Sequence, residues 1–160
     1  MFRILVLLLA AGSFAFGQQD VQSHDHQASV NQRGDKVMGF SHEKTAHHFV
    51  LTADGGLIEV RANDIHDAAT LNQIRGHFQH IVSMFADGNF NAPMLVHRQD
   101  VPGTATMARL KNDLHWELSE LPRGARITIT ADNKQALDAV HTFLRFQIAD
   151  HQTGDCIAIH

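Results

Sequence analysis

The chain has 160 residues, with 13 Lys and Arg against 17 Asp and Glu and a formal net charge of −4 when its histidines are neutral. Charged residues are interspersed and form no basic stripe, which excludes a typical nucleic-acid partner. Cys156 is the only cysteine, so the chain cannot form an intramolecular disulfide.

The N-terminus has the pattern of a secretory signal peptide. Arg3 provides a positive start, residues 4–11 are unbroken apolar sequence, and Ala15-Phe16-Gly17 places small residues at a cleavage site. We expect residues 1–17 to be removed and the protein to be periplasmic or secreted. The apolar run is shorter than the roughly 20 residues that span a bilayer, so we expect no membrane insertion.

The mature chain divides by composition into a polar segment and one domain. Residues 18–35 are mostly Gln, Ser, Asp, His and Asn, which predicts a mobile tail. Residues 36–155 are the right size for a single domain with its own core, and residues 156–160 form a short C-terminal tail.

The same local pattern occurs twice in the expected domain. His47–Ala53 and Leu57–Ala62 alternate around an Asp-Gly-Gly turn, and apolar residues at helical spacing follow until Asp87-Gly88. Leu114–Leu121 and Arg126–Ala131 alternate around a Pro-Arg-Gly turn and precede a helix that runs to about His151. The pattern predicts an α+β fold in which two helices pack on one face of an antiparallel sheet of four or five strands, with a ββα-ββα pseudo-duplication.

The long connection between the two repeats, residues 89–112, contains prolines and a short apolar piece. We interpret Met94-Leu95-Val96 as an edge strand within this connection.

Histidine is unusually frequent, because all 13 histidines lie after the expected signal peptide. Imidazole is the commonest protein ligand for transition metals and also titrates near neutral pH. Some positions are better explained without a metal. His115 alternates with outward-facing residues. His141 and His151 fall near the buried face of their helix, where a core histidine that bonds a backbone group is the commoner explanation.

The remaining positions give a candidate metal site. Strand alternation places His47 and His48 on opposite faces of their strand, and His77 and His80 are three residues apart on a helix and could chelate one ion. The candidate ligands for copper or zinc are His42, His47, His48, His77, His80 and His97. Four methionines would favour copper(I) over zinc if any of them joined the imidazoles, although such residues more often fill the core: Met38, Met84, Met94 and Met107.

Three segments resemble a family of small exported bacterial proteins: Val30–Phe49, with its VNQRGDKVMGFSHEKTAHHF sequence, Asn91–His97 and Phe143–Asp155. The resemblance covers most of the mature chain and implies no settled activity and no catalytic residue. Relatives of this kind are sometimes labelled aspartate carbamoyltransferase. This sequence does not support that label, because it lacks a Ser-Thr-Arg-Thr phosphate-binding loop and is too short for such a subunit.

The sequence therefore favours an exported histidine-rich protein that binds copper or zinc for buffering, delivery or sensing. One alternative is a non-enzymatic ligand-binding or interaction domain with an apolar pocket, a homodimer face or a non-covalent haem held by a pair such as His77 and His141. Another is a metal-dependent hydrolase, for which Glu43 is the clearest general base. A third is an envelope protein whose histidines confer only a response to pH.

Overall fold

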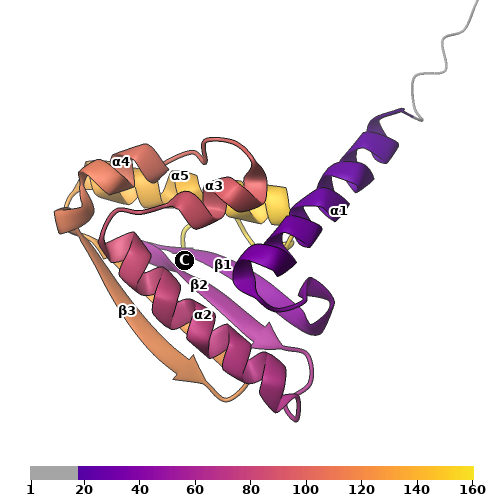
Figure 1. Ribbon diagram of the computed structural model, residues 1–160. Helices are drawn as coiled ribbons and strands as arrows, with labels where there is room; N and C mark the ends of the chain where they lie inside the picture. The colour runs from indigo at the N-terminus through magenta and orange to yellow at the C-terminus, as the bar shows by residue number, and fades with distance from the viewer. Residues whose placement is uncertain (1–17) are drawn as a thin grey trace, which may run out of the picture.

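The computed structural model describes residues 18–160, so the expected signal peptide lies outside the described residues. The described chain contains five α-helices and a four-stranded antiparallel sheet, which confirms the predicted α+β class (Figure 1). The helices are α1 (Gln18–Met38), α2 (Ala68–Ala86), α3 (Asn91–His97), α4 (Thr104–Arg109) and α5 (Lys134–His151), and the strands are β1 (Thr45–Thr52), β2 (Gly55–Ala62), β3 (Leu114–Leu121) and β4 (Gly124–Ala131).

The sheet has the order β1-β2-β4-β3, so the two hairpins meet through their second strands. Equivalent elements are 69 residues apart: β1 and β3 begin at Thr45 and Leu114, and β2 and β4 begin at Gly55 and Gly124. The same offset of 69 residues relates two backbone hydrogen bonds between the hairpins. Ala62 N donates to Arg123 O at 2.7 Å, and its counterpart Ala131 N donates to Asp54 O at 2.9 Å. This reciprocal bonding supports the ββα-ββα pseudo-duplication.

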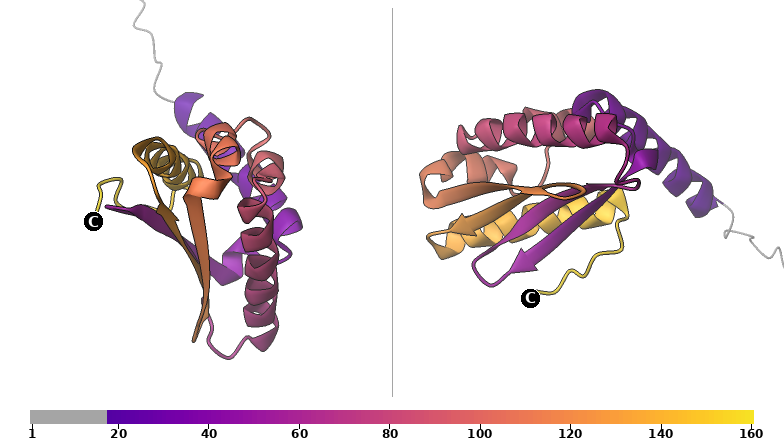
Figure 2. Two further views of the ribbon diagram at one scale, coloured as in Figure 1. Left: turned by 90° about the vertical axis from the view of Figure 1, so that its left-hand side faces the viewer. Right: turned by 90° about the horizontal axis from the view of Figure 1, so that it is seen from below.

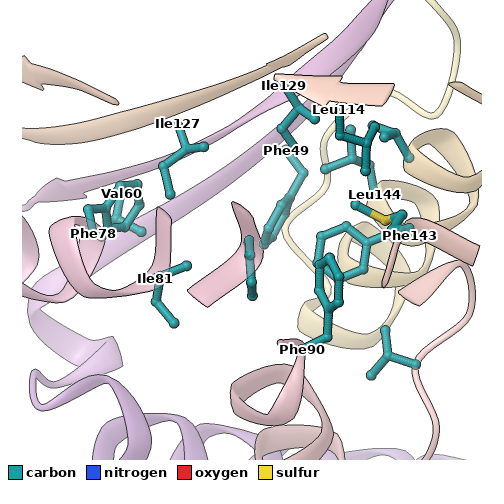
Figure 3. Packing of buried hydrophobic residues seen from close by; sticks show 14 of the residues in the cluster. Phe49, Val60, Phe78, Ile81, Phe90, Leu114, Ile127, Ile129, Phe143 and Leu144 are labelled. Carbon is teal, nitrogen blue, oxygen red and sulfur yellow. The ribbon is translucent and has the colours of Figure 1, made fainter. Parts of the chain in front are cut away.

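One face of the sheet carries the core. Strand alternation directs the side chains of Phe49, Val60, Ile127 and their neighbours to this face, where α2 and α5 cover them (Figure 3). The side chain of Asp67 caps the start of α2, and the side chain of Asn133 caps the start of α5. A single apolar cluster joins both repeats.

The polar segment before the domain differs from the expected mobile tail, because residues 18–38 form helix α1. Its first part projects from the body of the molecule, and its second part packs against α3 and α5 (Figures 1 and 2). Val30 is completely buried, and Arg33 Nε donates to Val96 O at 2.5 Å. These contacts are tertiary, so the composition of the segment alone does not reveal them.

The connection between the repeats also differs from the prediction. Residues 91–97 form the short helix α3, and no strand forms at Met94-Leu95-Val96. Pro93 lies in the first turn of α3, where a backbone N–H has no partner within the helix, so proline is tolerated there. Val96 and Val101 are buried and anchor the connection to the core.

The C-terminal tail runs beside β1, at the edge of the sheet (Figure 2). Ile159 forms an isolated parallel bridge with Leu51, and His160 N donates to Leu51 O at 2.9 Å. The tail therefore adds a minimal fourth pairing, at the β1 edge of the four-stranded sheet. Among residues 18–160, no helix combines the length and apolar character that crossing a membrane requires.

Candidate functional site

An apolar pocket of ≈ 80 Å³ lies between the sheet and the helices that cover it, and four histidines line it. Each histidine comes from a different element: His47 from β1, His77 from α2, His97 from α3 and His151 from the last residue of α5. Met38, at the end of α1, also lines the pocket. The fold thus brings together residues that are far apart in the sequence.

A thioether and an imidazole meet at one end of this pocket. His47 Nε2 lies 3.4 Å from Met38 Sδ. The ring of His151 is parallel to that of His47, with the ring centroids 5.8 Å apart, and lies 4.9 Å from the ring of His97. Phe40 packs against both His47 and His77, with ring centroids 6.0 and 5.6 Å away.

Three of the imidazoles in this pocket have lowered pKa values. Burial, with a smaller effect of nearby His77, lowers the pKa of His47 to about 4. Burial likewise lowers the pKa of His77 to about 4 and that of His151 to about 3. A neutral imidazole can bind a metal ion without first losing a proton, so these three rings are available as ligands at neutral pH.

His97 is more constrained than the other three histidines. Its side chain is only 1% exposed, Nδ1 donates to the Asp150 carboxylate at 2.5 Å, and Nε2 lies 3.1 Å from Gln147 Oε1. Asp150 also accepts from His26 of α1 at 2.8 Å. Both ring nitrogens of His97 are therefore engaged with side chains of α5.

A polar groove adjoins the pocket between α1, β1 and the end of α5. Met38, His47 and His151 line both the groove and the pocket, so they form the wall between them. His42 and His48 line the groove only. His42 Nδ1 donates to Asp35 at 3.0 Å, which also accepts from the backbone N of His42.

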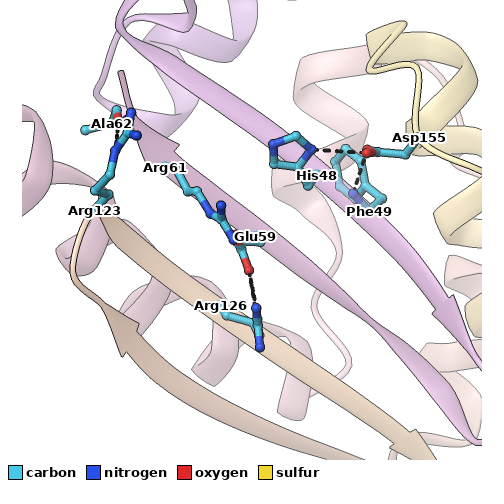
Figure 4. Close-up of polar contacts among 8 residues, drawn as sticks. All are labelled: His48, Phe49, Glu59, Arg61, Ala62, Arg123, Arg126 and Asp155. Atoms are coloured by element: carbon cyan, nitrogen blue, oxygen red, sulfur yellow. Dashed lines mark hydrogen bonds and ion pairs between the residues drawn. The ribbon is translucent and has the colours of Figure 1, made fainter. Parts of the chain in front are cut away.

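The structure thus separates the six predicted ligands. His47, His77 and His97 line one pocket, whereas His80 is exposed on α2. His48 lies on the other face of β1 and donates to Asp155 at 3.1 Å (Figure 4). Strand alternation predicts this separation of His47 from His48. Within residues 18–160, no three His, Cys, Asp or Glu side chains form a group that could hold a metal ion.

Two members of the pocket wall were not among the predicted ligands. In the sequence, Met38 is one of four candidate methionines, and His151 lies near the buried face of its helix, where a core role is the expected one. The stacking of His151 on Phe49, with centroids 5.8 Å apart, depends on how α5 docks against β1.

The residues that the haem and hydrolase alternatives require do not lie together in the pocket. His141 Nε2 donates to Thr52 O at 2.9 Å and does not line the pocket, which confirms the predicted core role and separates it from His77. The pocket is also smaller than a cavity of about 150 Å³ that holds benzene, so a haem does not fit it. Glu43 is exposed and lines neither the pocket nor the groove.

Comparison with known proteins gives no indication of a family or a function. No family model, no curated protein and no solved structure matches this chain.

Proposed function

We propose that this chain is an exported protein that binds copper(I) through Met38, His47 and His151 and serves in copper buffering or delivery. The 3.4 Å separation of His47 Nε2 and Met38 Sδ is the observation that supports the proposal most directly. An ion about 2.0 Å from the nitrogen and about 2.3 Å from the sulfur keeps this separation when the angle at the metal is about 104°, close to tetrahedral.

The ring of His151 is close enough to reach the same ion once it turns out of its nearly parallel alignment with the ring of His47. A metal about 2.0 Å from an imidazole nitrogen lies about 3.2 Å from the ring centroid, so two imidazoles on one ion have centroids about 5–6 Å apart. The centroids of His47 and His151 are 5.8 Å apart. The groove beside the wall provides a route by which an ion reaches these side chains, and His42 and His48 supply further imidazoles along it.

The donor set favours copper(I) over zinc. A thioether is a soft ligand that zinc rarely uses, whereas copper(I) accepts sulfur and imidazole together. The low pKa values of His47 and His151 leave both rings neutral at pH 7, so copper does not compete with protons there.

Copper(I) titration tests this proposal. The mature chain is prepared without an affinity tag and with Cys156→Ser, because exposed Cys156 is a competing thiolate ligand. Titration under anaerobic conditions against a chromophoric copper(I) chelator should give one ion per chain. We expect Met38→Leu, His47→Phe and His151→Phe each to weaken binding at least tenfold.

Matched controls carry the same substitutions elsewhere. Met94→Leu changes a half-buried methionine outside the wall, and His80→Phe changes an exposed histidine. Both should bind copper(I) as the Cys156→Ser parent does. A parent that binds no copper(I), or controls that lose as much affinity as the wall variants, would refute the proposal.

A further inference from the structure

The polar groove beside the pocket has the size of a small-molecule site. Its volume is ≈ 400 Å³, against ≈ 80 Å³ for the apolar pocket, and clefts that bind small molecules typically measure roughly 300–1,000 Å³. Its lining combines polar side chains such as Asn31 and Thr153 with apolar ones such as Val30 and Ala46. The groove can therefore hold an organic molecule that has both a polar group and a carbon chain.

Two histidines of the groove are held by carboxylates in the same way. Asp35 accepts hydrogen bonds from the backbone N of His42 at 2.7 Å and from its Nδ1 at 3.0 Å. Asp155 accepts from the backbone N of Phe49 at 2.9 Å and from His48 Nδ1 at 3.1 Å (Figure 4). Because each ring is held through Nδ1, its Nε2 is the nitrogen left to contact a ligand.

The two carboxylates bring negative charge to the groove. Within residues 18–160, Asp35 and Asp155 form ion pairs with these histidines and with no Lys or Arg. Their side chains are 32% and 17% exposed, so water screens their charge only in part. Arg33 and Lys36 of α1 do not line the groove. Both carboxylates would therefore attract a cation in the groove and repel an anion.

The groove also contains a hydrogen-bond acceptor without a donor. Gln27 Nε2 donates to Asn31 Oδ1 at 2.9 Å and lies 3.5 Å from the backbone O of His151. Because a backbone carbonyl can only accept, this contact favours the orientation in which Nε2 faces His151. Gln27 Oε1 is then buried without a hydrogen-bond partner among the described residues. A ligand with N–H groups would supply the missing donor.

We propose that the groove binds a small organic ammonium ion. Its N–H groups donate to Gln27 Oε1 and to the Nε2 atoms of His42 and His48. The carboxylates of Asp35 and Asp155 balance its charge, and the apolar part of the lining contacts its carbon chain. The inference goes beyond the proposed function, because it assigns the groove an organic ligand and involves no metal ion.

A matched pair of ligands tests this inference on the metal-free Cys156→Ser protein. Cadaverine carries an ammonium group at each end of its carbon chain, and 1,5-pentanediol carries hydroxyl groups on the same chain. Isothermal titration calorimetry is run at pH 8.5, above the range in which imidazoles ordinarily ionise. One cadaverine should bind per chain with a Kd below about 1 mM, whereas 1,5-pentanediol should not bind at about 10 mM.

Substitution of the carboxylates tests where the ligand lies. Asp35→Asn and Asp155→Asn should each weaken cadaverine binding by about fivefold or more, because each removes one charge beside the groove. Asp132→Asn is the matched control. It removes the same charge from the exposed pair of His115 and Asp132, which does not line the groove, so binding should stay within about twofold of the parent.

A variant outside the two carboxylates keeps the test valid if either of them fails to fold. Gln27→Met, at a partly exposed position of α1, keeps the length of the side chain and removes Oε1, so cadaverine binding should weaken roughly two- to tenfold. The inference is overturned if cadaverine does not bind, if 1,5-pentanediol binds equally well, or if Asp132→Asn loses as much affinity as Asp35→Asn. None of these results bears on the proposed function, because the protein is metal-free.

Discussion

Glu59 is buried on the sheet face that α2 and α5 do not cover. It is 3% exposed, and it accepts hydrogen bonds from Arg61 and, at 2.6 and 2.8 Å, from both Nη2 and Nε of Arg126 (Figure 4). Burial by itself would raise the pKa of Glu59, but the bonds from the two guanidinium groups outweigh it and hold the pKa below its ordinary value. Charge pairing across β2 and β4 therefore stabilises the junction of the two repeats.

Glu59→Gln should destabilise the protein by about 1–3 kcal/mol. The substitution keeps the shape but removes the charge that both guanidinium groups contact, and these groups are partly exposed, so water recovers part of the loss. Urea unfolding at pH 7 measures the change. The control Glu117→Gln, at an exposed position of β3, should stay within about 0.5 kcal/mol of the parent. Equal stability of both variants would contradict this role for Glu59.

Some helices and strands of this fold can be predicted from the sequence, and others cannot. Both hairpins, the helices α2 and α5 that follow them and the inward-facing residues follow from strand alternation and helical spacing, which are local signals. Helix α1 and helix α3 do not follow, because their stability comes from contacts such as Arg33 with Val96 O. The lining of the pocket follows from the sequence only in part: His47 and His77 lie on predicted faces, but Met38 reaches the pocket only through α1.

Substitution of the equivalent glycines Gly55 and Gly124 tests whether β2 and β4 pair as the pseudo-duplication requires. Each lies where β2 and β4 approach closely, and an added Cβ would overlap Ile129 O at Gly55 and Val60 O at Gly124. Gly55→Ala and Gly124→Ala should therefore each cost on the order of 3 kcal/mol, measured by urea unfolding.

The control for these variants is Gly76→Ala on α2. An added Cβ at Gly76 meets nothing within 4 Å, so alanine should stabilise the helix by up to about 1 kcal/mol. Tolerance of alanine at either strand glycine would show that the two hairpins do not approach each other as described.

The stability of the whole protein should decrease in acid, because three partly buried histidines are neutral in the folded state. Their pKa values are about 4, 4 and 3 for His47, His77 and His151, against 6.5 in the unfolded chain. As pH falls below 6.5 the unfolded state takes up protons before the folded state does. The free energy of unfolding should thus be greatest above pH 6.5 and fall by a few kcal/mol, as an order of magnitude, by about pH 4.

Urea unfolding at pH 7.5, 6 and 5 measures this dependence. His151→Phe cannot take up the proton, so its free energy of unfolding should decrease less over the same range. A parent protein with equal stability at the three pH values would contradict the neutral, buried state of these rings.

A bound copper ion would link three elements of the fold, α1, β1 and α5, because these contribute Met38, His47 and His151. X-ray absorption at the copper edge, on the copper(I)-loaded Cys156→Ser protein, tests this central claim most directly. We predict one sulfur scatterer at about 2.3 Å and two nitrogen scatterers at about 2.0 Å, with the sulfur lost in Met38→Leu and kept in Met94→Leu. A spectrum without sulfur, or one that Met38→Leu leaves unchanged, would contradict it.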